Sequence, residues 1–194
     1  MTTDPNHVVL DSSTLKALAH PLRVALLGAL RRHGPSTATL LGQRLDISSG
    51  SASYHLRQLE KAGLVTDDAG RGNARDRWWR AAHRMTEMDD RDFGDGDAEV
   101  VDEYLRSIAS AYTRQLEQTV NARATMQPDW RHVMDLSDYL LRVTPDEART
   151  LAMRLHAVVR EFRYDRPGNP APAGAEPVSV VLQILPQPVD EDPS

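Results

Sequence analysis

The chain has 194 residues, of which 40% are hydrophobic and 26% are charged, and these fractions are typical of a globular protein with one or two small domains. It contains no cysteine, which excludes disulfides and metal sites built on thiolates. No apolar run approaches the ~18–20 residues that a membrane-spanning helix needs, and Met1–Pro5 has neither the basic nor the apolar part of a signal peptide. We therefore expect a cytoplasmic protein with no membrane partner.

The net charge of −5 is divided unevenly along the chain. Residues 1–84 carry 12 Lys and Arg side chains against 7 Asp and Glu side chains, whereas residues 85–194 carry 11 against 21. This division indicates a basic module that binds an anionic partner, such as nucleic acid, joined to an acidic body. Chance segregation of charge would explain the same division without any such module.

Three helical patterns open the chain. Pro21 suits the first turn of the second helix, where its missing N–H does no harm, and Gly34 follows the basic end of that helix as a stop signal. Ser36 or Thr37 is positioned to cap the third helix. The apolar positions of the three helices are Leu15 and Leu18; Leu22, Leu26 and Leu30; and Leu40, Leu41 and Leu45. Their helical spacing predicts that each helix turns one face to a common core.

The helix predicted for residues 49–62 has two very different faces. Ala52, Leu56 and Leu59 form an apolar stripe that must face a core. The opposite face carries short or planar hydrogen-bonding side chains and one cation, namely Ser49, Ser51, Ser53, Tyr54 and Arg57. Such a face can approach a nucleic-acid groove closely, and the N-terminal N–H groups of a helix favour a phosphate. An ordinary surface helix is the alternative interpretation.

A β-hairpin is predicted after this helix. Leu64-Val65-Thr66 and Arg77-Trp78-Trp79-Arg80 have the composition of strands, and the residues between them are rich in turn formers. Residues 46–48 allow only a tight turn between the third and fourth helices, which therefore form a helix-turn-helix. A helix-turn-helix followed by a basic hairpin is a winged helix, which we place at residues 12–84 with its wing at residues 67–77.

This region resembles the ArsR-type (ArsR/SmtB-like) winged helix-turn-helix transcriptional regulators. The resemblance covers roughly residues 12–82. It rests on several motifs in the family's order and spacing, which are Leu15-Lys16-Ala17-Leu18-Ala19-His20-Pro21-Leu22-Arg23, Ser53-Tyr54-His55-Leu56-Arg57-Gln58-Leu59, Ala62-Gly63-Leu64-Val65 and Arg77-Trp78-Trp79-Arg80. The resemblance implies a homodimeric DNA-binding repressor that releases its operator when an effector binds.

Residues 85–97 are acidic, contain Gly94 and Gly96, and are predicted to be a linker. A long amphipathic helix is predicted for residues 98–126. In ArsR-like proteins such a helix pairs with its copy across the dimer, so the resemblance assigns dimerisation to Val101, Leu105, Ile108, Tyr112 and Leu116. Packing of this helix on its own domain is the alternative.

A small strand-helix-strand unit is predicted for residues 130–187. Residues 138–143 and 178–184 alternate apolar with other side chains as strands do, and Thr144-Pro145-Asp146-Glu147 has the form of a capping box that starts the helix between them. The predicted fold is therefore α+β and mainly helical, with a winged helix-turn-helix domain, a long dimerisation helix and this C-terminal unit. The unit would serve dimerisation, effector binding or both, and it exceeds the minimal ArsR plan.

The DNA-contacting side chains are expected on the fourth helix, which would be the recognition helix, and on the wing. In the major groove the hydroxyls reach base edges or phosphates, and Arg57 reaches a guanine edge or, more readily, a phosphate. Arg71, Arg75 and Arg77 would contact the DNA backbone or the minor groove and supply the salt-dependent part of the affinity. A solvated turn is the alternative for Arg71 and Arg75. We expect His55 to pack between helices and not to contact a base.

Neither metal nor catalytic chemistry is predicted. No cysteine pair precedes the recognition helix and no histidine lies within residues 98–125, so the ligand sets of metal-sensing ArsR proteins are missing. No nucleophile elbow, Walker loop or metalloprotease motif occurs, and we expect neither an enzyme nor a cofactor.

We interpret the chain as a transcriptional regulator that binds double-stranded DNA at a palindromic operator, as a homodimeric repressor released by an unidentified small-molecule effector. Two other classes of protein remain as alternatives. One is a winged-helix protein-interaction adaptor that does not read DNA. The other is an enzyme that carries a winged helix and has a deep polar pocket within residues 98–185.

Overall fold

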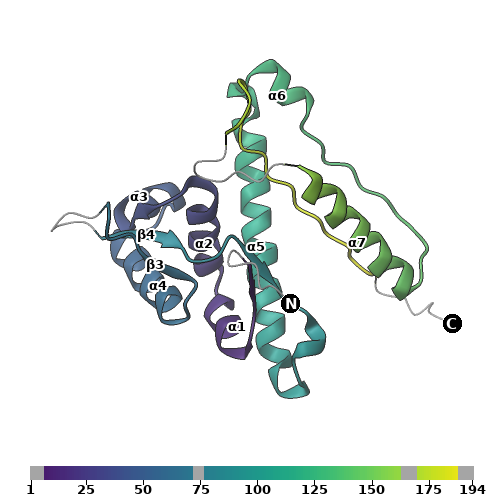
Figure 1. The fold of residues 1–194 in the computed structure, drawn as a ribbon, viewed down its shortest axis with the longest axis horizontal. Coiled ribbons are helices and arrows are strands. Elements are labelled where there is room, and N and C mark those ends of the chain that lie inside the picture. Colours follow the sequence, from purple (N-terminus) through teal and green to yellow (C-terminus); the bar gives the residue numbers. More distant parts are fainter. Residues whose placement is uncertain (1–6, 72–76, 163–169, 188–194) are drawn as a thin grey trace. The chain divides into compact units, whose positions relative to one another are not determined.

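The computed structural model describes residues 7–71, 77–162 and 170–187 (Figure 1). The chain divides into two compact units, Met1–Thr125 and Met126–Ser194, which we call unit 1 and unit 2 and describe separately. Over the described ranges, none of the helices combines the length and the apolar character needed to cross a membrane.

Unit 1 opens with four helices that begin at local capping signals. Asp11 and Thr14 form a reciprocal capping box, in which Thr14 N–H donates to the Asp11 carboxylate at 2.8 Å. Hydrogen bonds from the Thr14 hydroxyl and N–H lower the pKa of Asp11 to about 2. Thr37 Oγ1 accepts from the Leu40 N–H at 3.2 Å, and Pro21 lies in the first turn of its helix. The helices are α1 (Ser12–Leu18), α2 (Pro21–His33), α3 (Ala38–Leu45) and α4 (Ser49–Lys61).

A short turn joins α3 to α4 and holds the two helices close together. Asp46 ends α3 in the left-handed conformation, with φ of 55°, and Ile47 N–H donates to the Gly42 carbonyl at 2.9 Å. A Cβ atom added to Gly42 would lie 2.8 Å from the Ile47 carbonyl oxygen, so no side chain fits there. Gly42 therefore permits the close approach that makes the helix-turn-helix compact.

A three-stranded antiparallel sheet forms the wing and its base. β3 (Val65–Asp67) pairs with β4 (Trp78–Ala81), which confirms the predicted hairpin. The additional strand β2 (Ser36–Thr37) pairs with the other edge of β4, so that Ser36 lies opposite Trp79. Two residues are too few for a periodic pattern, so β2 is a strand that sequence patterning does not reveal.

Residues 85–97 were predicted to be a linker, and this prediction is wrong. They form a folded part of unit 1. Their first strand pairs in parallel with a strand from the N-terminal end of the described chain. Met88 and Phe93 pack against the core and are partly buried. The acidic residues around these two side chains give the segment the composition of a linker. The elements of this region are β1 (His7–Val9), β5 (Met85–Glu87), η1 (Asp90–Asp92) and η2 (Asp95–Asp97).

Arg31 of α2 ties this region to the helices. Its Nε donates to the His83 carbonyl at 2.9 Å and its Nη2 donates to the Thr86 hydroxyl at 2.7 Å. Burial lowers the pKa of Arg31 to about 10, so the guanidinium remains charged at neutral pH. The region around β5 is thus held to α2 by a buried cation as well as by apolar contacts.

The long helix α5 (Ala98–Ala122) continues into the 3₁₀ turn η3 (Arg123–Thr125), close to the end predicted for it. It packs on α1 and α2, and Val101 and Tyr104 are each only 6% exposed. Burial raises the pKa of Tyr104 to about 12. The first turns of α5 therefore complete the core of the winged helix and are not a separate segment.

One apolar core holds unit 1 together. It lies between the five helices and the inner face of the small sheet. Its largest fully buried side chains are Leu15, Leu26, Leu41, Leu56, Leu59, Leu64 and Val65. Because burying one such side chain stabilises a fold by about 1.5–3 kcal/mol, this core is the main source of the stability of unit 1.

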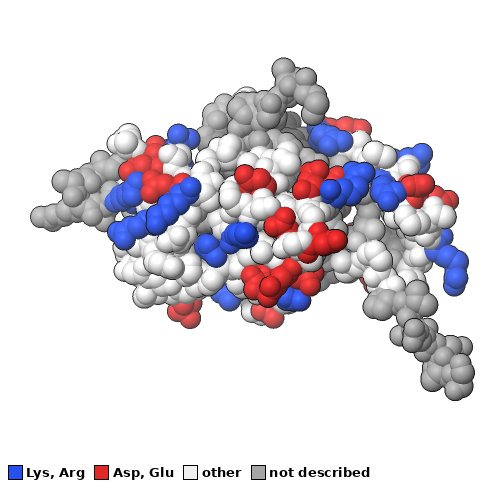
Figure 2. Space-filling view, turned by 90° about the horizontal axis from the view of Figure 1, so that it is seen from below, with Lys and Arg blue, Asp and Glu red and all other residues white. Residues whose placement is uncertain are grey.

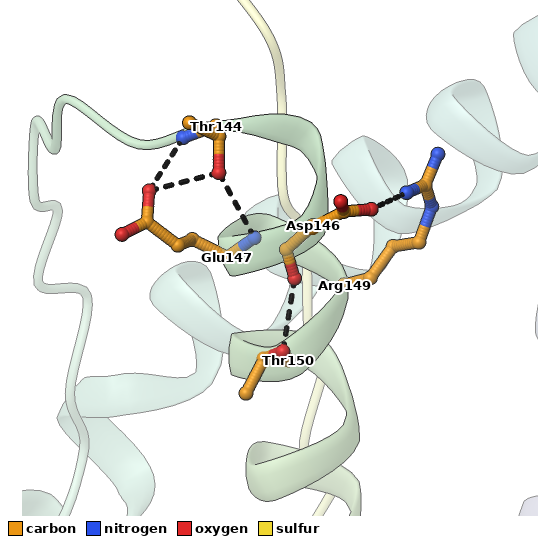
Figure 3. A network of polar contacts seen from close by, with 5 residues as sticks. All are labelled: Thr144, Asp146, Glu147, Arg149 and Thr150. Carbon is orange, nitrogen blue, oxygen red and sulfur yellow. Dashed lines mark hydrogen bonds and ion pairs between the residues drawn. The ribbon is translucent and has the colours of Figure 1, made fainter.

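Unit 2 contains the short helix α6 (Pro128–His132) and the long helix α7 (Pro145–Glu161). The predicted capping box at the start of α7 is confirmed (Figure 3). Thr144 Oγ1 accepts from the Glu147 N–H at 3.3 Å, and Thr144 N–H donates to the Glu147 carboxylate at 2.8 Å. The hydrogen bonds that the Thr144 N–H and hydroxyl donate to the Glu147 carboxylate lower the pKa of Glu147. The start of α7 is thus set by local interactions within the chain.

The two strands predicted for unit 2 are not strands in the structure, and this part of the predicted fold is corrected. Residues 138–143 and 178–184 belong to neither of the two sheets found in the described part of the chain, and both sheets lie in unit 1. Their side chains alternate as in a strand, but a strand also needs a partner for its backbone N–H and C=O groups. The described residues of one chain place no such partner beside them.

Candidate nucleic-acid interface

The helix α4 has one buried face and one open face, as predicted. Ser48 Oγ accepts from the Ser51 N–H at 3.1 Å and caps the helix. The residues Ala52, His55, Leu56 and Leu59 are buried. The five residues of α4 that are predicted to contact DNA all retain exposed surface, and they are Ser49, Ser51, Ser53, Tyr54 and Arg57. Tyr54 is 59% exposed, so its ring is available to a partner.

The open face of α4 borders a hollow of about 200 Å³ in unit 1. Side chains from the start of α3, the middle of α4 and the beginning of β4 meet there. The lining residues are Thr37, Ala38, Thr39, Ser53, Arg57, Arg77 and Trp79. The hollow thus joins predicted DNA-contacting residues of the helix and of the wing to the first turn of α3, which the sequence did not indicate.

The chemistry of this hollow suits an anion. Thr37 caps α3, and the first N–H groups of a helix together with the helix dipole favour negative charge beside them. Arg57 is exposed and pairs with no carboxylate in the described ranges. A phosphate in the hollow would meet a guanidinium, the Ser53 hydroxyl and the start of α3 at once.

Arg77 lies at the base of the wing and is already engaged by acidic groups. Its Nη2 lies 2.6 Å from a Glu60 carboxylate oxygen, and its Nε lies 2.9 Å from an Asp67 carboxylate oxygen. Its guanidinium also stacks over the Trp79 ring, 4.1 Å from the ring centroid. These contacts fix the hairpin against α4 and offset the charge of Arg77, so we expect Arg57 to contribute more to phosphate binding.

The structure describes only part of the wing. Arg71 is exposed, and its Nε lies 3.5 Å from the Asp68 carboxylate. Arg75 lies outside the described residues. Figure 2 shows Lys and Arg side chains at the left end of the view, where unit 1 carries α3, α4 and the wing, together with Asp and Glu side chains beside them.

A pair of imidazoles, His55 buried and His20 partly buried, lies behind the open face of α4. The rings of His20 and His55 lie 4.4 Å apart, and Tyr54 meets the edge of His55 at 5.1 Å. Burial, together with the neighbouring charge of Arg23, lowers the pKa of both histidines. His55 is buried, which confirms that it packs between helices. The two imidazoles therefore join α4 to the start of α2.

A second uncovered surface runs along α5. Val101 and Ile108, both predicted to contact a dimer partner, pack against the core of unit 1 instead. The other predicted dimerisation residues are centred about 50° further round the helix than those two, at 3.6 residues per turn. This exposed face, which we call the α5 stripe, consists of Leu105, Tyr112, Leu116 and Val120, each 36% to 48% exposed.

In the described part of the chain, no three His, Cys, Asp or Glu side chains come together as a metal-ligand set. Two hollows of unit 1, lined by residues between His33 and Trp79, are open to solvent. Both therefore lie on the winged helix.

Comparison with known proteins supports the assignment of this region. Residues 18–68, from the end of α1 to the end of the β3 strand, match a family model described as a helix-turn-helix domain. No curated protein matches the chain. This domain match supports a role in DNA-binding transcription regulation.

Two solved structures resemble the chain distantly. Disulfide-formed AbfR is 20% identical, with 54% of this chain and 72% of that chain covered at a TM-score of 0.29. A mutant of Lactococcus lactis ZitR in its apo form is 15% identical, with 77% and 84% covered at a TM-score of 0.29. Likenesses this distant carry no inference about the partners of this chain.

Proposed function

We propose that this protein is an ArsR-type transcriptional regulator that binds a palindromic operator in double-stranded DNA as a homodimer and represses transcription. One observation carries the proposal. The uncharged hydroxyl face of α4 borders a hollow in which Arg57, without an acidic partner in the described ranges, lies beside the capped start of α3.

In this account α4 enters the major groove and the hollow receives a backbone phosphate. The phosphate fixes the register of the helix, while Ser49, Ser51 and Tyr54 face base edges. Hydroxyls accept and donate, so they discriminate bases weakly, and specificity depends on several contacts acting together. Arg71 and Arg75 of the wing add backbone or minor-groove contacts.

The α5 stripe provides the dimer contact. A stripe of four large apolar side chains along one helix is suited to pack against a copy of itself around a two-fold axis. Two recognition helices related by that axis would meet half-sites roughly 34–36 Å apart, or a multiple of this distance. We assign the response to a small-molecule effector to unit 2, because the DNA-contacting residues lie in unit 1.

The proposal is tested by mixing the purified protein with sheared genomic DNA and sequencing the fragments that it retains. The expected result is enrichment of a two-fold symmetric motif with half-sites one helical turn apart or a multiple of it. Ser53→Asp, which places a carboxylate in the hollow, should abolish this enrichment because it repels phosphate. Ser110→Asp on the exposed side of α5 is the matched control and should leave enrichment unchanged.

Two outcomes would contradict the proposal. Retention of no fragments by the folded wild-type protein would favour a protein-interaction adaptor. Equal retention by the Ser53→Asp variant would show that DNA binds elsewhere on the molecule.

A further inference from the structure

Arg23, in the first turn of α2, is a cation in an unfavourable place. This turn contains no acidic residue, and the positive end of a helix dipole disfavours a cation beside it. The side chain is partly buried, and its Nε is shielded from solvent and makes no hydrogen bond within the described ranges. Burial lowers the pKa of Arg23. A guanidinium held in this way destabilises the fold unless an anion lies beside it.

The side chains around Arg23 provide no anion. Tyr54, His20 and His55 lie close enough to Arg23 to act on it electrostatically or to be acted on by it. Histidine is neutral or cationic, and tyrosine is neutral at physiological pH. No carboxylate pairs with Arg23 in the described ranges, and the buried Nδ1 of His55 makes no hydrogen bond there either. These four side chains together have the charge of an anion-binding site.

This cluster borders α4 on the flank opposite the hollow. At 3.6 residues per turn, Ser53 and Tyr54 project about 100° apart from α4. Ser53 lines the hollow beside α3 and the wing. Tyr54 instead meets the edge of the His55 ring, and His55 in turn lies against His20 at the start of α2. The open face of α4 is thus bordered by the hollow on one side and by Arg23 on the other.

We propose that Arg23 binds a second backbone phosphate of the DNA, across the major groove from the phosphate that the hollow receives. A helix in the major groove lies between two phosphate backbones, so that cations on both of its flanks fix its register. Tyr54 is 59% exposed and makes the side of Arg23 continuous with the open face of α4. The proposal rests on the proposed function, and it adds to the DNA interface a residue outside the helix-turn-helix and the wing.

The salt dependence of binding to a labelled duplex of mixed sequence tests this contact, because a backbone contact acts on all sequences. In the full-length protein, Arg23→Gln should weaken binding and reduce the slope of log affinity against log salt by about 1. Arg32→Gln is the matched control at the other end of α2, where Arg32 Nη1 donates to the Gln115 side chain of α5 at 3.1 Å. This control should change neither the affinity nor the slope.

The double variant Arg23→Gln/Arg57→Ala tests whether two phosphates are bound. Contacts with separate phosphates should together reduce the slope by about 2, whereas two cations on one phosphate would not add in this way.

A third variant separates DNA binding from stability. Arg23→Glu places a carboxylate in the first turn of α2, where the helix dipole favours it. This variant should keep or raise the melting temperature and yet lose more affinity for DNA than Arg23→Gln. A lower melting temperature in both variants would instead attribute the weaker binding to the fold and overturn the contact.

Two further results would overturn the inference alone. An unchanged slope for Arg23→Gln, while the wild-type protein binds the duplex, would remove Arg23 from the interface and leave the proposed function standing. A slope reduced by only about 1 in the double variant would mean that Arg23 and Arg57 do not hold separate phosphates. A folded wild-type protein that binds neither this duplex nor any genomic fragment would contradict the proposed function itself, and this inference with it.

Discussion

The two units of this chain differ in how they cover their apolar side chains. Unit 1 encloses a core in which Leu15, Leu26 and Leu56 have no exposed surface. Unit 2 begins its long helix with a complete capping box but buries none of its described residues fully. Local signals thus determine where helices start in both units, but among the described residues the tertiary contacts that close a core lie in unit 1. The comparison indicates that unit 1 folds from its own contacts and that unit 2 needs a further surface.

The largest loss of stability is expected from a substitution in the core of unit 1. Leu56→Ala should lower the free energy of unfolding of unit 1 by about 2–5 kcal/mol, because it removes a fully buried side chain of α4 and leaves a cavity. Leu155→Ala, the same change on the exposed face of α7, should cost less than about 1 kcal/mol in the monomer. Urea denaturation of both variants at a concentration below dimerisation checks the difference. Equal losses would contradict the comparison.

A second prediction concerns the close approach of α3 and α4. Gly42→Ala should destabilise unit 1 by about 1–3 kcal/mol, because the new Cβ would lie 2.8 Å from a backbone oxygen that cannot move independently. Gly28→Ala is the matched control, since its nearest neighbour is the flexible end of the Arg32 side chain and alanine favours a helix. Thermal unfolding should separate the two variants. Unchanged stability of Gly42→Ala would show that the turn can relax.

A third prediction concerns His20 and His55, the two adjacent imidazoles of unit 1. Because burial lowers the pKa of His20 and His55, the unfolded chain binds protons more readily than the folded one. The contribution of these two histidines to the free energy of unfolding of unit 1 should therefore be complete above about pH 6.5, the ordinary pKa of histidine. It should fall as the pH drops below that value. His20→Gln/His55→Gln should reduce the difference between urea midpoints at acidic and neutral pH. His132→Gln/His156→Gln in unit 2 should leave that difference unchanged.

The helices of unit 1 and the hairpin of its wing could be predicted from the sequence, because the signals that specify them are local. Thr37 and Ser48 each cap the helix that follows them. The hollow could not be predicted from the sequence, since it depends on how closely α3, α4 and β4 approach one another. The cap at Thr37 is visible in the sequence, but its position beside Arg57 is a tertiary fact.

Periodicity also left two ambiguities that only packing resolves. The apolar residues of α5 form two faces, and spacing alone does not tell that Val101 faces the core while Leu105 faces outward. Alternation in unit 2 predicts two strands that are not strands in the described structure, because a side-chain pattern does not say whether a backbone partner is present in the same chain. In both cases the missing information is the identity of the neighbouring surface.

The central claim is that the open face of α4 and its hollow bind the DNA backbone through Arg57. The most direct measurement is the salt dependence of binding to a labelled operator duplex for the wild-type protein and for Arg57→Ala, with Arg106→Ala on α5 as the control. The account predicts that Arg57→Ala weakens binding to all sequences similarly and reduces the slope of log affinity against log salt by about 1, whereas Arg106→Ala changes neither. An unchanged slope for Arg57→Ala would contradict it.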